Sequence, residues 1–394
     1  MSLRKRSINL KLIVPLFFVT GVMGARPLIP LIADELNADH FDIGLLVSVF
    51  SLFPFLIAIK VGQVMDKIGY KNPIILSGVI GIGSLLVPFF FPNMVGLYIS
   101  QILAGSVYTV FIMGAQTYGG TDSSEQEKDH NIVMISVGVS IGSFIGPLLS
   151  GVFAEVWGYR ISFALMGLAI LPSLFIASNI KDKKQEINYY KRTAKFINSL
   201  TLLKEVDIRK VILISMIVLA GRDIFTAYIP LIGISNGLSN SMIGFIVSIN
   251  AFAGIIVRWS MPYLILKFGR NNITLCAILG SGALFLLIPI ASSSISLILV
   301  SFILGMGLGL GQPLSISTMV HILPQKRIGE GLGLRLSASR FAQLSSPVLF
   351  GFVAQIFSMS FAFFFAGTLI LFSGAKTKIN DNCPTTLVLK KGNN

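Results

Sequence analysis

The fold is decided by one short charged stretch, which reads Gly62-Gln63-Val64-Met65-Asp66-Lys67-Ile68-Gly69-Tyr70-Lys71. It separates two apolar runs, at about residues 43–65 and 72–92. Each run approaches or exceeds the roughly 20 apolar residues that one helix needs to cross a bilayer core of about 30 Å. The stretch therefore predicts a tight turn at a membrane surface, between two helices that cross the membrane.

The composition of the whole chain agrees with a membrane protein. Of its 394 residues, 54% are hydrophobic and only 12% are charged, and the mean hydropathy is +0.81. A soluble protein with so few charges would expose large apolar patches and aggregate. The two cysteines, Cys276 and Cys383, have no metal-ligand spacing and no obvious partner. We expect neither a metal nor a cofactor.

Twelve apolar runs are candidates for membrane-crossing helices. Their apolar character is continuous rather than alternating, which excludes membrane-spanning strands. No A-x-A-like cleavage site follows the basic N-terminus, so the first run is expected to be a retained helix and not a signal peptide. The runs lie at about 12–34, 43–65, 72–92, 94–119, 131–153, 159–179, 208–233, 241–266, 272–291, 293–322, 330–354 and 357–375.

Twelve crossings also sort the basic residues by side. They place 24 Lys and Arg residues on one side and only Arg160 on the other, where the first loop is acidic. The positive-inside rule then puts the basic side, with both termini, in the cytoplasm. The net charge of +14 follows from these membrane-side clusters, so we expect a cytoplasmic-membrane protein and no nucleic-acid partner.

A polar segment and an internal repeat divide the chain into halves. We predict one bundle at 1–180, a cytoplasmic linker at 181–207, and a second bundle with a tail at 208–394. A shift of 200 residues aligns matching features of the two halves. The aligned features are Pro30-Leu31 with Pro230-Leu231, Ile43-Gly44 with Ile243-Gly244, Lys67 and Gly69 with Lys267 and Gly269, Gly105 with Gly305, Pro147 with Pro347, and Gly151 with Gly351. Two such halves are expected to enclose a site near the bilayer midplane.

The opening stretch resembles the signature loop of the major facilitator superfamily, G-x-x-x-D-[RK]-x-G-[RK]-[RK], with Tyr70 at one basic position. A second pattern resembles the antiporter motif of the drug:proton branch, with Ser150 replacing one glycine; it comprises Gly138, Gly142, Gly146, Pro147 and Gly151. The resemblance covers essentially the whole chain. It implies an all-α integral membrane protein with twelve helices in two pseudo-symmetric six-helix bundles, working as a monomer and favouring export. The family's buried helix-4 arginine falls on Gln101, so its proton-relay role does not carry over.

The few ionisable residues inside the apolar runs are candidates for function. A charge at a helix centre costs at least about 2.5–3.5 kcal/mol, so each needs a partner, a water-filled cavity or a role. The deep positions carry up to five arginines, including Arg258, Arg335 and Arg340, against one clear acid, Asp223. Because guanidinium groups match carboxylates and phosphates, this balance favours an anionic or zwitterionic solute.

These observations assign three sets of roles. We expect Arg26, Arg222 and Gln312 to contact substrate, and Asp223, with Asp34 second, to carry protons. We expect a cytoplasmic gate in which Asp66 lies near the start of the eleventh helix; its residues are Gly62, Asp66, Lys67, Gly69, Lys71, Glu330 and Arg335. We expect Glu330 to form an ion pair with either Arg335 or Arg340.

The predicted function is proton-coupled efflux of a small organic solute across the cell membrane by alternating access. One alternative is a facilitator or importer of an organic anion. A receptor or scaffold is a second alternative, although the chain has no large soluble domain for signalling. No G-x4-G-K-[ST], H-E-x-x-H or G-x-S-x-G motif is present, so neither an ATP-driven pump nor an enzyme is expected.

Overall fold

The computed structural model describes the backbone of residues 2–120, 125–180, 201–323 and 327–377. Side chains in these ranges are described except at 2–9, 57–68, 120, 125–130, 328 and 329. All secondary structure in these ranges is helical, as the sequence predicted. The predicted linker at 181–207 falls largely outside the described residues, and only its last part, with a short 3₁₀ turn at Thr201–Lys204, is described.

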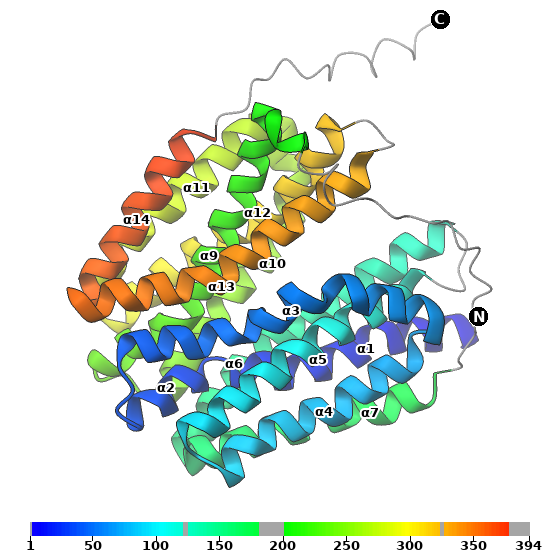
Figure 1. Cartoon of the computed structure of the whole chain (residues 1–394), viewed down its shortest axis with the longest axis horizontal. Coiled ribbons are helices and arrows are strands. Elements are labelled where there is room, and N and C mark those ends of the chain that lie inside the picture. The colour runs from blue at the N-terminus through cyan, green and yellow to red at the C-terminus, as the bar shows by residue number, and fades with distance from the viewer. Residues whose placement is uncertain (1, 121–124, 181–200, 324–326, 378–394) are drawn as a thin grey trace, which may run out of the picture.

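The helices group into an N-terminal half and a C-terminal half (Figure 1). The N-terminal half contains α1 (Ser2–Ala25), α2 (Leu28–Glu35), α3 (His40–Ile68), α4 (Lys71–Phe90), α5 (Met94–Gly120), α6 (Glu125–Leu168) and α7 (Leu171–Ser178). The C-terminal half contains α9 (Val206–Ser235), α10 (Asn240–Phe268), α11 (Arg270–Leu287), the 3₁₀ turn Ile288–Ile290, α12 (Ser294–Ile322), α13 (Ile328–Ile356) and α14 (Met359–Ala375).

Two helices are interrupted in ways that the apolar runs did not show. The run predicted at 12–34 is broken at Arg26-Pro27, between α1 and α2. Proline lacks an amide hydrogen and disfavours helical geometry in the residue before it, which accounts for the break. In α6, Gly158 has φ 78° and ψ 168°, which splits the element in two. The break at Arg26 positions that side chain in the interior.

The predicted repeat is visible in the structure. Helices α3 and α10 begin and end exactly 200 residues apart, and each is followed by a glycine with positive φ, 81° at Gly69 and 78° at Gly269. Glycine adopts positive φ without the steric cost that a Cβ atom would bring, so the chain can turn sharply after each helix. The tight helix contacts repeat as well: Gly105 packs on the Phe50 carbonyl, and Gly305 on the Asn250 carbonyl. The two halves therefore share one pattern of packing.

The glycines of the α6 motif bring the backbones of α1 and α6 close together. A Cβ atom at Gly142 would lie 2.6 Å from the Leu16 carbonyl oxygen, and one at Gly146 would lie 2.6 Å from that of Thr20. Both contacts are to α1 backbone, which cannot move aside as a flexible side chain would. Small residues at such interfaces allow close approach of membrane helices.

This packing predicts that Gly142→Ala destabilises the protein. Overpacking a tight contact costs about 1–3 kcal/mol. The midpoint of thermal unfolding in detergent is therefore expected to fall, while Gly83→Ala is the matched control, because a Cβ there meets nothing within 4 Å. An unchanged midpoint for Gly142→Ala would show that α1 adjusts freely.

Eight helical segments of the described chain are long and apolar enough to cross a membrane. One of them, Asn131–Ser178, has 48 residues and would extend about 72 Å if straight, roughly twice what one crossing requires. It contains the Gly158 break. The total of twelve crossings stays a prediction.

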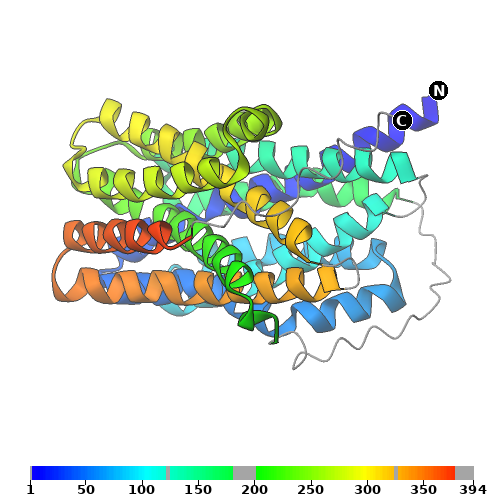
Figure 2. The same cartoon turned by 90° about the horizontal axis from the view of Figure 1, so that it is seen from above.

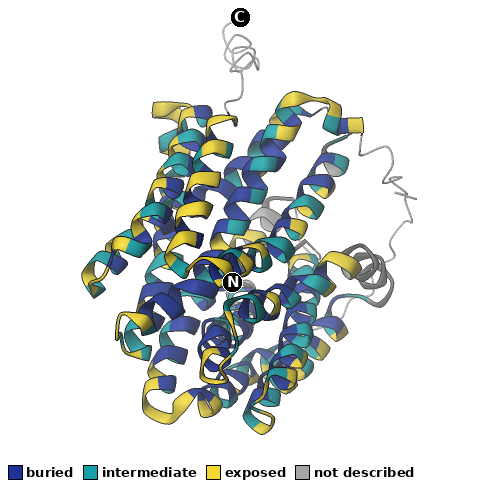
Figure 3. Ribbon diagram, turned by 60° about the vertical axis from the view of Figure 1, so that its left-hand side comes forward, coloured by how far each residue is buried: buried dark blue, intermediate teal, exposed yellow. Residues whose placement is uncertain are grey.

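The two halves meet along two pairs of helices, α3 with α13 and α6 with α10 (Figures 1 and 2). Buried residues gather where helices meet, and exposed residues cover the outer faces (Figure 3). Hydrogen bonds between the halves cluster near the turns at 36–39 and 236–239. There the Tyr228 hydroxyl donates to the His40 carbonyl at 3.2 Å, and the Tyr159 hydroxyl to Asn240 Oδ1 at 2.9 Å. We call this the closed end.

Candidate functional site

A cavity lies between the halves, at the centre of the bundle. Its described lining comes from α1, α5 and α6 on one side and from α9, α10 and α12 on the other. The lining includes three arginines and no carboxylate. Its polar and charged members are Arg26, Tyr108, Ser140, Ser143, Arg222, Thr226, Asn250, Arg258 and Gln312. The sequence-predicted substrate residues Arg26, Arg222 and Gln312 are thus brought together at one cavity.

Arg26 and Asp223 form an ion pair that joins the two halves. Arg26 Nη1 lies 3.2 Å from Asp223 Oδ1, and the two side chains are 11% and 3% exposed. The Arg26 guanidinium also stacks 4.5 Å from the centre of the Phe50 ring. Because a buried charge is stabilised by a counter-ion and an aromatic face, this arrangement explains how both charges are tolerated here. Because Asp223 pairs with Arg26, it does not pair with Arg222, its neighbour in the sequence.

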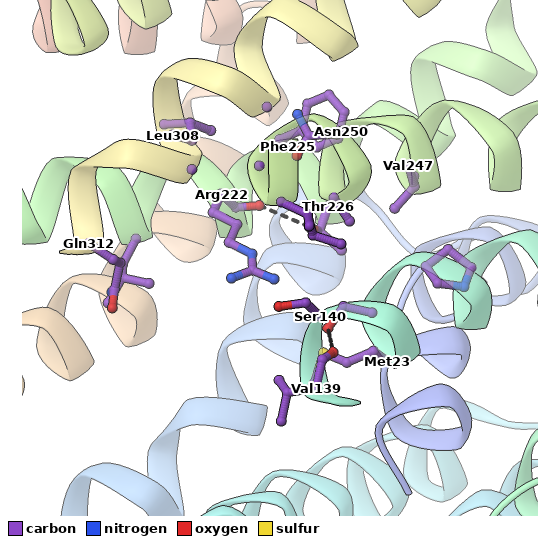
Figure 4. A pocket seen from close by; sticks show the side chains of 18 of the residues that line it. Met23, Val139, Ser140, Arg222, Phe225, Thr226, Val247, Asn250, Leu308 and Gln312 are labelled. Carbon is purple, nitrogen blue, oxygen red and sulfur yellow. Dashed lines mark hydrogen bonds between the residues drawn. The ribbon is translucent and has the colours of Figure 1, made fainter. Parts of the chain in front are cut away.

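Arg222 faces the cavity and is exposed there, whereas Asp223 is buried. Figure 4 shows the Arg222 side chain extending from α9 toward Ser140 of α6. Arg258 on α10 also lines the cavity, where its Nε donates to the Gly309 carbonyl at 3.0 Å and its charge interacts with that of Arg222. No carboxylate of the described residues pairs with either arginine. Two like charges therefore converge on a space that an anion would neutralise.

The other acid predicted to carry protons lies elsewhere. Asp34 is exposed at the last turn of α2, near the closed end, and is not part of the cavity lining. The structure therefore places Asp223 beside the cavity, paired with the lining residue Arg26, and Asp34 away from the cavity. Gln101 is buried and also lies outside the lining.

The predicted gate residues are only partly described. Gly62 and the side chains of Asp66 and Lys67 lie outside the described set, whereas Gly69 lies in the turn between α3 and α4 and Lys71 is the first residue of α4. Glu330 does not pair with Arg335 or Arg340. Its carboxylate instead accepts from Arg327 Nε at 3.0 Å.

Arg335 is buried within the C-terminal half. Its Nη1 donates to Ser215 Oγ at 2.6 Å and to Ser315 Oγ at 3.2 Å, which ties α13 to α9 and α12. Arg340 lies within electrostatic range of Asp223 and Arg26, and its Nη1 donates to Gln343 Oε1 at 3.0 Å. Arg335 thus holds three helices together in the described conformation.

Several lining residues were not predicted as site residues. Arg258 was counted among the deep arginines without a role, and Tyr108, Ser140, Ser143 and Asn250 were not considered. Asn250 could have been selected as a candidate from the sequence, because it is a polar residue within an apolar run. Its Nδ2 donates to the Ser301 carbonyl at 2.9 Å, so it also joins α10 to α12.

Comparison with known proteins assigns this architecture. The profile of the Major Facilitator Superfamily matches residues 12–273 and 211–377, which together cover most of the chain. The chain belongs to the major facilitator superfamily. As a member of that superfamily it is a multi-pass membrane transporter and not an enzyme.

Individual relatives agree with the superfamily assignment. The chain is 25% identical over 350 residues to an uncharacterized MFS-type transporter of Methanocaldococcus jannaschii, covering 86% of this chain and 89% of that protein. It is 22% identical over 388 residues to Multidrug resistance protein 2 of Bacillus subtilis, covering 93% and 95%. A crystal structure of the nucleoside transporter NupG matches with a TM-score of 0.79 at 12% identity, covering 94% of this chain and 99% of the other. The last match shows the major facilitator fold.

Proposed function

We propose that this transporter exports a small organic anion or zwitterion from the cytoplasm in exchange for protons, by alternating access. The observation that carries the proposal is the charge pattern at the cavity. Its described lining contains three arginines and no carboxylate, and the one buried acid beside it, Asp223, is held by Arg26. Arg222 and Arg258 are left to bind a solute.

The solute class follows from the chemistry of these groups. Guanidinium groups donate paired hydrogen bonds to carboxylates and phosphates, and such charge-assisted bonds are about twice as strong as neutral ones. Asn250 and Gln312 add neutral amide groups to the lining. A cationic solute would meet uncompensated repulsion from Arg222 and Arg258.

Proton coupling would use the ion pair between the halves. In the described conformation, Arg26 of the N-terminal half and Asp223 of the C-terminal half hold the halves together beside the cavity. Protonation of Asp223 would remove its charge and weaken this link. A proton taken up by Asp223 from outside would therefore be released to the cytoplasm when the ion pair with Arg26 forms again in the described conformation.

The orientation and direction rest on the sequence. The basic side predicts that the closed end faces outward and that the opposite end faces the cytoplasm. The antiporter-like glycine motif of α6 and the similarity to Multidrug resistance protein 2 support export. The described conformation would then be closed to the outside.

Transport by the purified protein in proteoliposomes tests the proposal. A metabolite that accumulates in a deletion strain identifies the solute, and its movement is then followed with and without an imposed pH gradient. We expect the gradient to drive the solute against its concentration. Transport that is indifferent to the gradient, with counterflow intact, would instead favour a facilitator of organic anions.

A further inference from the structure

A second cavity lies on the outer side of the helices that line the first. It is a groove formed by α10, α11 and α12, with a volume of ≈ 440 Å³, within the range of about 300–1,000 Å³ typical of ligand sites. Val257, Leu264, Ile303, Met306 and Leu310 are among its apolar walls. Gly254 and Gly309 line the central cavity instead and pack against each other. On α12, the residues that line the groove therefore lie on the opposite face from those that line the central cavity.

The surface next to the groove is apolar and uncovered by the described chain. Within the groove wall, Phe268 of α10 and Ile303 of α12 are each 51% exposed, and Cys276 of α11 is also exposed. In a membrane protein, an exposed apolar face of this kind contacts lipid. The groove therefore opens toward the acyl region of the bilayer.

One end of the groove carries a positive charge. Lys267 is the last basic residue of α10, and its Nζ lies 5.3 Å from the centre of the Phe268 ring, which is part of the groove wall. No Asp or Glu occurs in the whole sequence between Asp223 and Glu330. An anion at Lys267 would meet no nearby acid from α10, α11 or α12. The charge at this end complements a phosphate group.

We propose that the groove binds one acyl chain of an anionic phospholipid, whose phosphate lies against Lys267. The apolar walls would take the acyl chain, and the Lys267 ammonium would select the anionic headgroup. This site is independent of the transported solute, because the groove and the central cavity are separated by α10 and α12. A lipid here would contact the helices that line the transport path from behind.

Native mass spectrometry of the detergent-purified transporter tests this proposal with phosphatidylglycerol and phosphatidylcholine of the same acyl chains. The wild type is expected to retain one phosphatidylglycerol in preference to phosphatidylcholine. Gly280→Phe should abolish this preference, because a Cβ at Gly280 meets nothing within 4 Å and the ring would fill the groove. Lys267→Gln should lower phosphatidylglycerol binding about fivefold, the factor that corresponds to about 1 kcal/mol for one basic group.

Gly83→Phe is the matched control, because Gly83 is an exposed glycine with equally open space on α4, the counterpart of α11. It should retain phosphatidylglycerol as the wild type does. The proposal would be overturned if Gly280→Phe retained as much phosphatidylglycerol as the wild type. It would also be overturned if the wild type retained phosphatidylglycerol and phosphatidylcholine equally.

A second measurement needs no change to the groove. Cys276 is exposed in the groove wall and can be labelled with a maleimide in a Cys383→Ser background. Added phosphatidylglycerol is expected to slow the labelling, and phosphatidylcholine to leave it unchanged. Identical labelling rates with the two lipids would contradict the proposal.

Discussion

Asp223→Asn is expected to reduce pH-driven transport in proteoliposomes to the level of empty liposomes. The variant removes the carboxylate that would carry the proton and leaves Arg26 without its counter-ion. Removal of one partner of a buried pair costs about 3–5 kcal/mol of stability, so the single variant alone does not separate coupling from folding. Its thermal unfolding should be measured beside its transport.

The double variant Arg26→Gln/Asp223→Asn makes that separation. Both charges leave together, so the protein is expected to recover most of its stability. Solute counterflow should persist in the double variant, whereas the pH gradient should no longer drive transport. Full pH-driven transport by the double variant would show that the pair is structural. Asp207→Asn is the control, since it makes the same change in a more exposed pair on α9, with Lys210 at 3.4 Å.

Arg222→Gln is expected to weaken solute binding by about 10- to 150-fold. Hydrogen bonds to charged groups contribute about 1.5–3 kcal/mol, and 1.4 kcal/mol corresponds to a factor of ten. The half-saturating concentration for counterflow measures this loss. The affinity of Arg222→Lys for the solute should lie between those of the wild type and Arg222→Gln. Lysine keeps the positive charge but lacks the planar pair of donors of arginine.

Arg209→Gln provides the control for Arg222. It removes an exposed arginine from the same helix, outside the cavity lining, and should leave solute binding unchanged. A neutral ester of the solute should bind Arg222→Gln and the wild type alike. Unchanged affinity of the anion for Arg222→Gln would exclude Arg222 from the substrate site.

The sequence was sufficient for the fold because its signals repeat. Glycines and prolines 200 residues apart occupy equivalent contacts, such as Gly44 against the Pro347 carbonyl and Gly244 against the Pro147 carbonyl. The glycine contacts of α6 also follow a local pattern, because a spacing of four residues places small residues along one side of a helix. These are local patterns that the chain itself displays.

The site was only partly predictable, because its pairings join distant segments. Adjacent residues on a helix point about 100° apart, so the sequence could not tell whether Arg222 or Asp223 faced the cavity. In the structure, Arg26 at the break between α1 and α2 pairs with Asp223, and Arg222 is the residue that faces the cavity. Glu330 is a simpler case: Arg327 is three residues away at the N-cap of α13, whereas Arg335 is five residues away and engages serines of two other helices.

The repeat relates glycine contacts of one half to those of the other, but it does not relate the charges. Counting 200 residues across, the positions that match Arg26, Arg222, Asp223 and Arg258 are Thr226, Val22, Met23 and Ala58. Two copies of the N-terminal half would bring two arginines and no aspartate to the centre, and two copies of the C-terminal half would bring two aspartates without Arg26. The two halves therefore share a scaffold but are not interchangeable, because an assembly of two copies of either half would lack the ion pair between Arg26 and Asp223.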